Sequence, residues 1–307
     1  MLGKPVIPVI LGPTASGKTA VGIEVCEKLN GEIISADSRQ IYRMMNIGTA
    51  KPGPEELSRC RHHLIDFLDP KEIFSAGDFV KAAVVVTEEI ISRNKLPVIV
   101  GGAGLYLKAL TEGIFEGDSS DPQVRQKLEK EYDSGHPEEL YDRLTKIDPA
   151  YAKIVHPNDR KKLVRALEIF EVTGLTVSEL NEHQPSGKIA GIMCGLTLPR
   201  EELYRRIEER VDKMLADGLI DEVAHLKEIG LTEEDNSMKS PGYKEVLQYL
   251  DGAIKYDEMT ELIKQNTRRY AKRQITWFKN TPNVKWFDAG NGLESTAEVI
   301  VNFIERQ

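Results

Sequence analysis

The sequence predicts an α/β fold: a parallel sheet flanked by helices, with an all-helical insertion. Short, almost entirely apolar runs alternate with stretches of helical periodicity, as in parallel sheets that are buried on both faces. Glycine-rich or polar turns follow several of these runs, whereas only helical patterns occur between residues 121 and 188. We therefore expect a core formed by residues 1–120 and 189–307, and a helical insertion formed by residues 121–188.

Composition places the chain among globular proteins and excludes several other classes. Of its 307 residues, 40% are hydrophobic and 29% are charged. No run of about 18 apolar residues occurs, so we expect no membrane span, and the first strand begins too early for a signal peptide. Three widely spaced cysteines, Cys26, Cys60 and Cys194, favour a reducing, cytoplasmic location. The net charge of −8 argues against a nucleic-acid partner unless basic residues cluster locally.

The first predicted strand leads into a phosphate-binding loop. Residues 6–11 are apolar, residues 12–19 match the pattern G-x-x-x-x-G-K-[ST], and residues 20–29 have helical spacing. This order is typical of a P-loop NTPase-like core, whose loop N–H groups and helix N-terminus bind a diphosphate or triphosphate. We expect Lys18 to reach the outer phosphate and the Thr19 hydroxyl to bind Mg²⁺. The predicted diphosphate-binding residues of the loop are Gly12, Pro13, Thr14, Ala15, Ser16, Gly17, Lys18 and Thr19.

A second predicted strand, residues 32–36, ends at Asp37. Ligands of parallel sheets bind outside the carboxyl ends of the strands, so we expect Asp37 to lie beside the phosphate loop. A turn or helix cap is the alternative role for an aspartate in this position, and the residues alone leave both open. Lys51, in the loop of residues 48–52, is a second candidate phosphate contact.

Four further elements complete the first half of the core. They are a strand at residues 62–67, a helix at 75–93 that Ser75 and Asp78 can cap, a strand at 96–100 and a helix at 105–110. The segment Cys60 to His63 has one cysteine and no partner pair at a usual ligand spacing, so we predict no metal site there. Gly101, Gly102 and Gly104 allow a ligand to approach the backbone closely.

The insertion follows a linker at residues 116–122 and carries one basic helix. We expect helices at residues 122–132, 137–147, 159–173 and 177–183. The third of them begins with a group of basic residues from Arg160 to Arg165. Such a group is either a solvated helix face or a nucleic-acid contact.

The second half of the core ends in a strongly basic helix. A strand at residues 189–198 precedes helices at 200–215 and 219–229, and the chain closes with a strand at 283–288 and a helix at 293–305. Between Leu262 and Phe287 there are seven basic residues and no acidic ones, and Tyr270, Trp277 and Phe278 are interleaved with them. This pattern indicates a surface for a phosphate backbone, or alternatively a helix that pairs with acidic neighbours.

Several of these segments together resemble the tRNA dimethylallyltransferases, the bacterial tRNA isopentenyltransferase family. The resemblance covers essentially the whole chain in order. It rests on the phosphate loop and on DSRQIY at 37–42, GTAKP at 48–52, GGAGLY at 101–106, RALE at 165–168, GYK at 242–244 and KRQITW at 272–277. The family commonly has threonine where this chain has Ala103, so position 103 can contribute only backbone or steric contacts.

The resemblance implies a reaction and the residues that perform it. A dimethylallyl group moves from dimethylallyl diphosphate to N6 of adenosine 37 in the tRNA anticodon loop, with Asp37 as general base, Mg²⁺ on Thr19, and Arg210 as a further diphosphate clamp. It also implies that the core is catalytic and that the insertion contacts tRNA. We expect the protein to act as a monomer. The implied tRNA contacts are Asp37, Ser38, Arg39, Gln40, Ala103, Arg125, Lys161, Lys162, Leu163, Val164, Arg165, Lys239, Gly242, Tyr243, Lys244, Lys272, Arg273 and Lys279.

Two other classes of protein share the phosphate loop. A P-loop kinase of a small metabolite or nucleotide requires a set of lid arginines that closes over ATP, and does not need the basic C-terminal helix. An ATPase module that uses RNA as a scaffold predicts nucleotide hydrolysis stimulated by RNA. Stabilisation by dimethylallyl diphosphate compared with ATP, each with Mg²⁺, distinguishes these classes.

Overall fold

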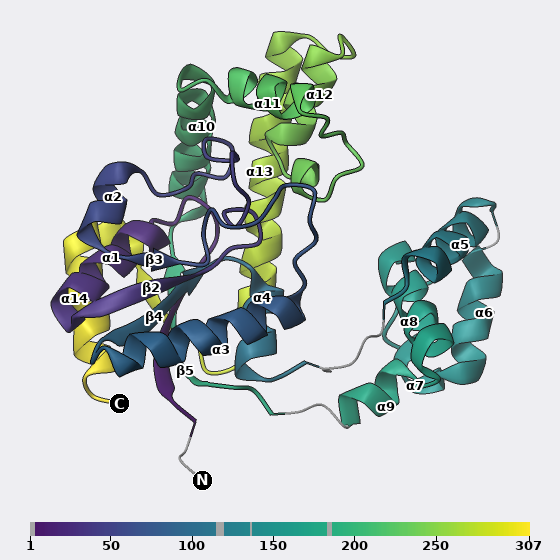
Figure 1. Cartoon of the computed structure of the whole chain (residues 1–307), viewed down its shortest axis with the longest axis horizontal. Coiled ribbons are helices and arrows are strands. Elements are labelled where there is room, and N and C mark those ends of the chain that lie inside the picture. The colour runs from purple at the N-terminus through teal and green to yellow at the C-terminus, as the bar shows by residue number, and fades with distance from the viewer. Residues whose placement is uncertain (1–3, 115–119, 136, 183–185) are drawn as a thin grey trace. The chain divides into compact units, whose positions relative to one another are not determined.

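The computed structural model describes residues 4–114, 120–135, 137–182 and 186–307 (Figure 1). The chain divides into two compact units, Met1–Thr111 with Gly187–Gln307, here called the core, and Glu112–Ser186, the insertion. The insertion expected from the sequence starts and ends slightly later than these limits. Part of the expected linker at residues 116–122 lies outside the described residues.

A six-stranded parallel sheet of order β3-β2-β4-β1-β5-β6 organises the core, so the predicted α/β class is confirmed. Its strands are β1 (Val6–Leu11), β2 (Gly31–Ala36), β3 (His62–His63), β4 (Leu96–Gly101), β5 (Ala190–Thr197) and β6 (Lys285–Asp288). The last residue of β1, Leu11, is paired with Gly101 of β4. The two glycine-rich turns therefore leave the sheet side by side at its carboxyl edge.

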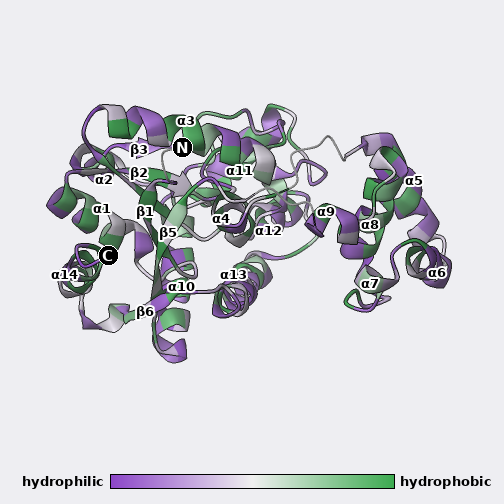
Figure 2. Ribbon diagram, turned by 90° about the horizontal axis from the view of Figure 1, so that it is seen from below, coloured by the Kyte–Doolittle hydropathy of each residue, from purple (hydrophilic) through white to green (hydrophobic). Residues whose placement is uncertain are grey.

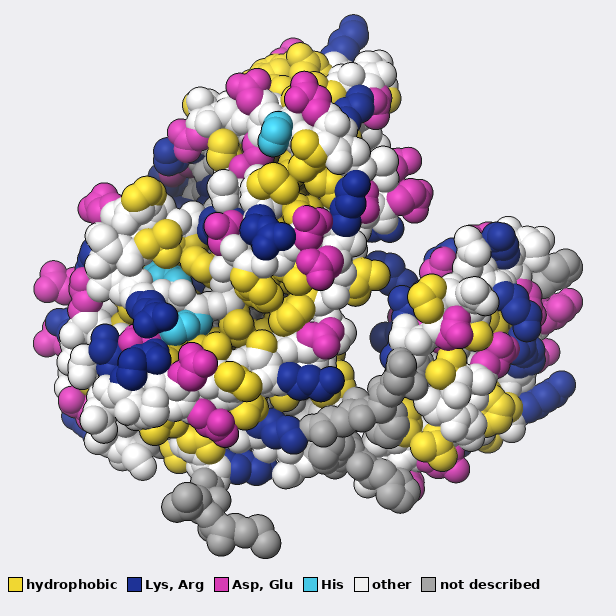
Figure 3. Space-filling view, in the orientation of Figure 1, with side chains coloured by type: hydrophobic (Ala, Val, Ile, Leu, Met, Phe, Trp, Pro, Cys, Tyr) yellow, Lys and Arg dark blue, Asp and Glu magenta, His cyan; other side chains and the backbone are white. Residues whose placement is uncertain are grey.

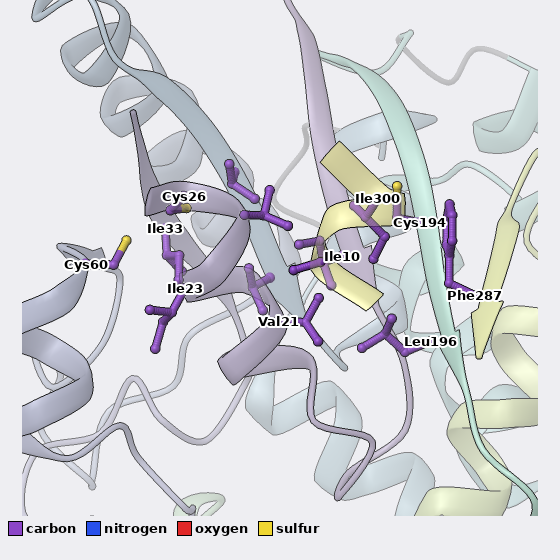
Figure 4. Packing of buried hydrophobic residues seen from close by; sticks show 14 of the residues in the cluster. Ile10, Val21, Ile23, Cys26, Ile33, Cys60, Cys194, Leu196, Phe287 and Ile300 are labelled. Carbon is purple, nitrogen blue, oxygen red and sulfur yellow. The ribbon is translucent and has the colours of Figure 1, made fainter. Parts of the chain in front are cut away.

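Helices cover both faces of the sheet (Figures 1 and 2). On one face lie α1 (Lys18–Leu29) and α14 (Leu293–Ile304), and on the other lie α3 (Ala76–Ser92) and α4 (Gly104–Thr111). The central strands are hydrophobic along their length in Figure 2, as burial on both faces requires. Figure 4 shows the resulting packing, in which Ile10 of β1, Val21 of α1 and Ile300 of α14 share one buried cluster.

A second group of helices stands beyond the carboxyl edge of the sheet. It consists of α10 (Arg200–Ala216), α11 (Leu219–Glu228), α12 (Tyr243–Leu250) and α13 (Tyr256–Lys279), with a short 3-10 turn at Ser237–Lys239. Its apolar cluster includes Tyr42 and Met45, which belong to the loop after β2, together with Tyr243 and Met259. This loop is therefore held between the sheet and the helices above it.

The insertion has an apolar core of its own. Its described helices are α5 (Pro122–Asp133), α6 (Pro137–Ile147), α7 (Pro149–Ala152), α8 (Arg160–Thr173) and α9 (Val177–Glu182). Leu128, Leu140 and Leu163 are fully buried in the cluster between them. His183, the expected last residue of α9, lies outside the described residues. At the base of the insertion, the core closes because the N–H groups of Lys188 and Ile189 both donate to the carbonyl of Leu110.

The strand predicted at residues 62–67 exists but is shorter than expected. β3 ends at His63, because Leu64 and Asp66 have φ values of 58° and 55°, and a strand cannot continue through left-handed residues. Two short helices, α2 (Pro54–Arg59) and α7, were not predicted. No helix in the described ranges has both the length and the apolar character to cross a membrane.

Candidate active site

The phosphate loop has the curled backbone that its sequence predicts. Gly17 precedes α1 with φ 87°, and Ala15 is also left-handed with φ 63°. Two left-handed residues at a helix N-terminus turn successive N–H groups toward one side, which forms an anion-binding concavity. Ala15 is held in this conformation by packing against Leu203 and Ile207 of α10 and Ala271 of α13.

Two partly buried cations, Lys18 and Arg210, lie at the phosphate loop. Burial lowers the pKa of Lys18 to about 8, Asp37 raises it, and Arg210 lowers it further. Burial is also the main cause that lowers the pKa of Arg210, whose guanidinium donates to Thr14 Oγ1 over 3.3 Å. Two cations with one neighbouring carboxylate create a strong preference for a bound anion.

One carboxylate oxygen of Asp37 caps the turn that follows β2, and the other is available to another partner. Its Oδ1 accepts hydrogen bonds from the backbone N–H groups of Arg39, at 2.8 Å, and Gln40, at 3.3 Å. Within the part of the chain that the structure describes, Oδ2 accepts no hydrogen bond. The alternatives that the sequence left open, a turn cap and a reactive carboxylate, are therefore compatible in one side chain.

A cavity of about 230 Å³ joins these groups, and here it is called the Asp37 cavity. It is lined by Thr14 and Lys18 of the phosphate loop, by the turn at Asp37, by α10 and α13, and by the loop before α12. Val211, Met214 and Ile263 give it an apolar side. Of the residues predicted from the sequence, it brings together Thr14, Lys18, Asp37, Ser38, Arg39, Arg210, Lys239, Gly242 and Arg273.

A smaller cavity, of about 20 Å³, lies behind Asp37 and is lined by Lys18, Thr19 and His62 among others. The ring nitrogen Nδ1 of His62 lies 2.8 Å from the carbonyl of Cys60, which assigns its proton to Nδ1. The other ring nitrogen, Nε2, is buried and has no hydrogen-bond partner. Burial lowers the pKa of His62, so the neutral form with an accepting Nε2 is favoured.

Gln274 is a site residue that the sequence analysis did not single out. Its Oε1 accepts from the N–H of Thr14 at 2.8 Å, and its Nε2 donates to the carbonyl of Gly102 at 3.0 Å. An added Cβ on Gly102 would lie 2.4 Å from this amide, so glycine is required there. Gln274 therefore ties α13 to both glycine-rich turns; its only sequence signal is its place in the segment KRQITW.

Glu222 of α11 is a second residue that supports the site and that the sequence did not indicate. Its carboxylate accepts from the N–H groups of Asn46, Ile47 and Gly48, and from the hydroxyl of Tyr243 at 2.6 Å. From the other side, the amide of Gln40 donates to the carbonyls of Thr49, at 3.2 Å, and Ala50, at 2.9 Å. The loop that lines the cavity at residues 48–50 is thus fixed on both sides.

Several sequence predictions need correction because the side chains serve the fold. Lys51 is not a phosphate contact, since its ammonium donates to Tyr42, Asn46 and Asp66 and is largely buried. Tyr243, Leu163 and Val164 are buried in apolar clusters, so their side chains are not available to tRNA. The amide of Gln40 makes the loop contacts described above, and its contact with tRNA stays a prediction.

The basic helix α13 has two different halves. Lys264 pairs with Asp212 and Arg268 with Glu208, both at 2.7 Å, so the interpretation as a helix with acidic neighbours holds for this half. Lys272 and Lys279 are exposed and form no ion pair with any described residue, and Arg273 lies over the ring of Tyr270. We call this C-terminal part of α13, residues 272–279, its unneutralised half. It carries the three basic residues of α13 that are predicted to contact tRNA, Lys272, Arg273 and Lys279.

In the insertion, most basic side chains pair with acidic ones. Figure 3 shows the two kinds interspersed over its visible face. Arg160 binds Glu129 and Asp133, whereas Lys161 is exposed. Arg125 and Arg165 meet at one carboxylate, the fully buried Glu168, with N–O distances of 3.0 and 2.8 Å.

The remaining predicted positions lie at the edges of the site. Ala103 is half-buried, and its N–H donates to the carbonyl of Ala36. Beside it, an added Cβ on Gly104 would meet the ring of Trp277 at 2.3 Å. Lys244 is exposed, and Lys162 pairs with Asp159. No cluster of three or more metal-ligating residues occurs in the described part of the chain.

The residues that form this site lie largely within a segment that matches a known protein family. A family model described as IPP transferase matches residues 40–281. The chain belongs to the IPP transferase family. The matched range includes Arg210, Glu222 and Gln274, which position or line the Asp37 cavity.

Members of the IPP transferase family resemble this chain over nearly its full length. The tRNA dimethylallyltransferase of Thermotoga maritima is 46% identical over 300 residues, which are 96% of this chain and 98% of that protein. The enzyme of that name from Geobacter sulfurreducens is 43% identical over 98% of this chain and 97% of its own.

Solved structures of the family share the fold. The full-length tRNA isopentenylpyrophosphate transferase of Bacillus halodurans is 43% identical, with a TM-score of 0.74 over 99% of this chain and 96% of that one. A eukaryotic dimethylallyltransferase, described as acting on tRNA, is 29% identical, with a TM-score of 0.85 over 99% of this chain and 80% of that one.

Proposed function

We propose that the chain transfers a dimethylallyl group from dimethylallyl diphosphate to N6 of adenosine 37 in the anticodon loop of tRNAs, giving N6-dimethylallyladenosine and releasing diphosphate. Family membership and the names of the relatives support an enzyme that prenylates tRNA over a P-loop kinase or an RNA-scaffolded ATPase. The structural observation that carries the proposal is the cavity shared by Lys18, Arg210 and Asp37.

The phosphate loop supplies the leaving-group chemistry. An allylic diphosphate ionises readily once the charge on its leaving group is neutralised, and preorganised donors supply that neutralisation at little reorganisation cost. The loop N–H groups and the partly buried cations Lys18 and Arg210 are such donors. The apolar side of the cavity, with Val211, Met214 and Ile263, suits the dimethylallyl group.

The residues around Thr19 fit Mg²⁺. The Thr19 hydroxyl and the Asp37 carboxylate line the same small cavity, and hard oxygen donors of this kind, completed by substrate phosphates and water, are those that Mg²⁺ prefers. Thr19 would hold the ion, which when bound neutralises charge on the diphosphate. The residues themselves bind and orient the diphosphate on the loop.

Asp37 is the proposed general base. The exocyclic amine of adenine is a weak nucleophile, because its lone pair is delocalised into the ring, and it gains reactivity when an acceptor takes its proton. The unbonded Oδ2 of Asp37 is such an acceptor, while Oδ1 fixes the orientation of the carboxylate through the turn. A base inside a stacked loop cannot reach this oxygen, so the adenosine must be flipped into the cavity.

The unneutralised half of α13 is the proposed surface for the tRNA backbone, and the insertion adds contacts through Arg125, Lys161 and Arg165. On α13, cations without carboxylate partners bind phosphates and release counterions. In the insertion, Arg125 and Arg165 share the single carboxylate of Glu168, so these three side chains together carry a positive charge. We also propose that the protein acts as a monomer in the cytoplasm, where tRNA is the substrate and where the three free cysteines remain reduced.

Mass analysis of a tRNA pool tests the proposal. After incubation with the protein, Mg²⁺ and dimethylallyl diphosphate, we expect nucleosides heavier by one dimethylallyl group at adenosine 37, and none without the diphosphate. In parallel, the diphosphate should raise the Tm more than ATP does. An unmodified tRNA pool together with stronger stabilisation by ATP would replace the proposal with a kinase.

A further inference from the structure

A second cavity of the core lies on the other side of the phosphate loop, and here it is called the Trp286 cavity. Its volume is about 510 Å³, within the range of ligand-binding sites. It is lined by Pro13, by the end of β5, by the first turns of α10, by the last turns of α13, and by Trp286 of β6. None of the reaction chemistry proposed above uses it.

Its floor is apolar and aromatic. Leu196 and Leu203 are buried, Ile275 is partly buried, and the indole of Trp286 remains 36% exposed. Trp286 packs closely on β5: a Cβ added to Gly195 would lie only 2.8 Å from the indole. A large aromatic surface is thus held in place while it still contacts solvent.

Its rim carries three cations, Arg200, Lys272 and Lys279, and none of them forms an ion pair with a carboxylate in the described ranges. The contrast along the same helices is clear. On α10, Arg205 and Arg206 both pair with Glu202, and on α13 the N-terminal half is paired with α10. In a chain of net charge −8, three unneutralised cations around one apolar cavity indicate an anionic ligand.

A flat ring that carries phosphates matches both the floor and the rim. Aromatic side chains bind unpaired bases by stacking, and lysine and arginine bind the adjoining phosphates. The two cavities are lined by consecutive residues, Thr14 for one and Pro13 for the other, and α13 contributes to both. A strand with one base in the Asp37 cavity therefore has neighbouring nucleotides near the Trp286 cavity.

We propose that the Trp286 cavity binds the unstacked base of a second anticodon-loop nucleotide, next to the one that is modified. The base lies against Trp286 and Tyr204, and its phosphates lie on Arg200, Lys272 and Lys279. This inference rests on the proposed function, because it assigns a subsite to the same RNA substrate.

An abasic scan tests the subsite. Anticodon stem-loops that lack the base at one loop position at a time are titrated against the wild type and Trp286→Ala. At one of the two positions adjacent to 37, loss of the base should weaken binding to the wild type about 5- to 150-fold, the range of one base–aromatic stack. The same loss should leave binding to Trp286→Ala unchanged. Equal losses in both proteins at every position would overturn the proposal.

A second variant, Arg200→Ala, tests the subsite independently, in case Trp286→Ala does not fold. Arg200→Ala should lower the salt slope of stem-loop binding by about one unit. Arg205→Ala, on the same helix but paired with Glu202, is the matched control and should keep the slope. An unchanged slope in Arg200→Ala would count against the subsite.

Tryptophan fluorescence in a Trp277→Phe background, which leaves Trp286 as the sole reporter, tests the occupant. We expect quenching by the stem-loop and none by dimethylallyl diphosphate or AMP. Quenching by either small molecule alone would replace the RNA subsite with a small-ligand site. If the wild type binds no stem-loop at all, the proposed function itself fails, and the inference fails with it.

Discussion

The side-chain oxygen of Gln274 accepts the backbone N–H of Thr14 at 2.8 Å, across 260 residues of sequence. The same amide donates to Gly102, so one side chain of α13 fixes the spacing between the phosphate loop and the second glycine-rich turn. The shape of the diphosphate site therefore depends on a helix whose other residues are proposed to contact tRNA.

Replacing Gln274 should impair the site without altering its charged groups. Gln274→Ala leaves the Thr14 N–H and the Gly102 carbonyl without partners, at a cost of about 1–3 kcal/mol for each buried group. We expect a lower Tm and weaker binding of dimethylallyl diphosphate, measured by calorimetry. Gln265→Ala, on an exposed position of the same helix, is the control. Unchanged diphosphate affinity in Gln274→Ala would show that the tie does not shape the loop.

Asp37→Asn separates the two roles of this residue. The asparagine oxygen can still accept the N–H groups of Arg39 and Gln40, so the turn should persist, whereas the base is lost. Single-turnover transfer to tRNA should slow by about 10²–10⁴-fold, with little change in diphosphate affinity. Transfer at a near-normal rate would remove Asp37 from the proton-transfer step.

The lowered pKa of Lys18, about 8, predicts a pH dependence of diphosphate binding. The ammonium is charged below this value and neutral above it, so affinity should fall as the pH rises through about 8. Lys18→Arg keeps its charge throughout and corrects for the titration of the diphosphate itself. Parallel pH profiles for the two proteins would contradict the role of Lys18.

Chelation of Mg²⁺ tests the role assigned to Thr19. Removal of the ion should slow transfer and weaken diphosphate binding, because charge on the leaving group is then less well neutralised. Thr19→Val removes the hydroxyl at similar size, so its activity should respond less to added Mg²⁺. Transfer that continues unchanged after chelation would exclude a metal at this position.

The two halves of α13 provide a matched pair of double variants. Replacing Lys272 and Arg273 with alanine should weaken tRNA binding and flatten its salt dependence by about one unit per lost phosphate contact. Replacing Lys264 and Arg268, which are paired with α10, should change the slope much less. Affinities measured across a salt series decide between them. Equal slopes in both double variants would mean that the tRNA docks elsewhere.

The sequence was most informative where a local pattern determines local structure. The apolar runs located the long strands, and the spacing of residues 12–19 located a left-handed loop before a helix, since both follow from neighbouring residues. It did not reveal Gln274 or Glu222, because their roles consist of hydrogen bonds to backbone groups far away in the chain. The sequence suggested Lys51 as a phosphate contact, because nothing near it in the sequence indicates that its ammonium binds the Tyr42 carbonyl and the Asp66 carboxylate instead.

The hydrogen bonds from Lys188 and Ile189 to Leu110 join the two ends at which the insertion leaves and re-enters the core. The insertion is thus a module on a closed stem, and a short turn in its place would leave every strand of the sheet connected as before. Such a shortened chain would retain the phosphate loop and α13 but lack Arg125 and Arg165. Comparing tRNA binding by the shortened and the full chain would show whether the core or the insertion supplies most of the affinity. The stem also marks a point at which an RNA-binding module can be added, enlarged or exchanged during evolution without a change in the catalytic sheet.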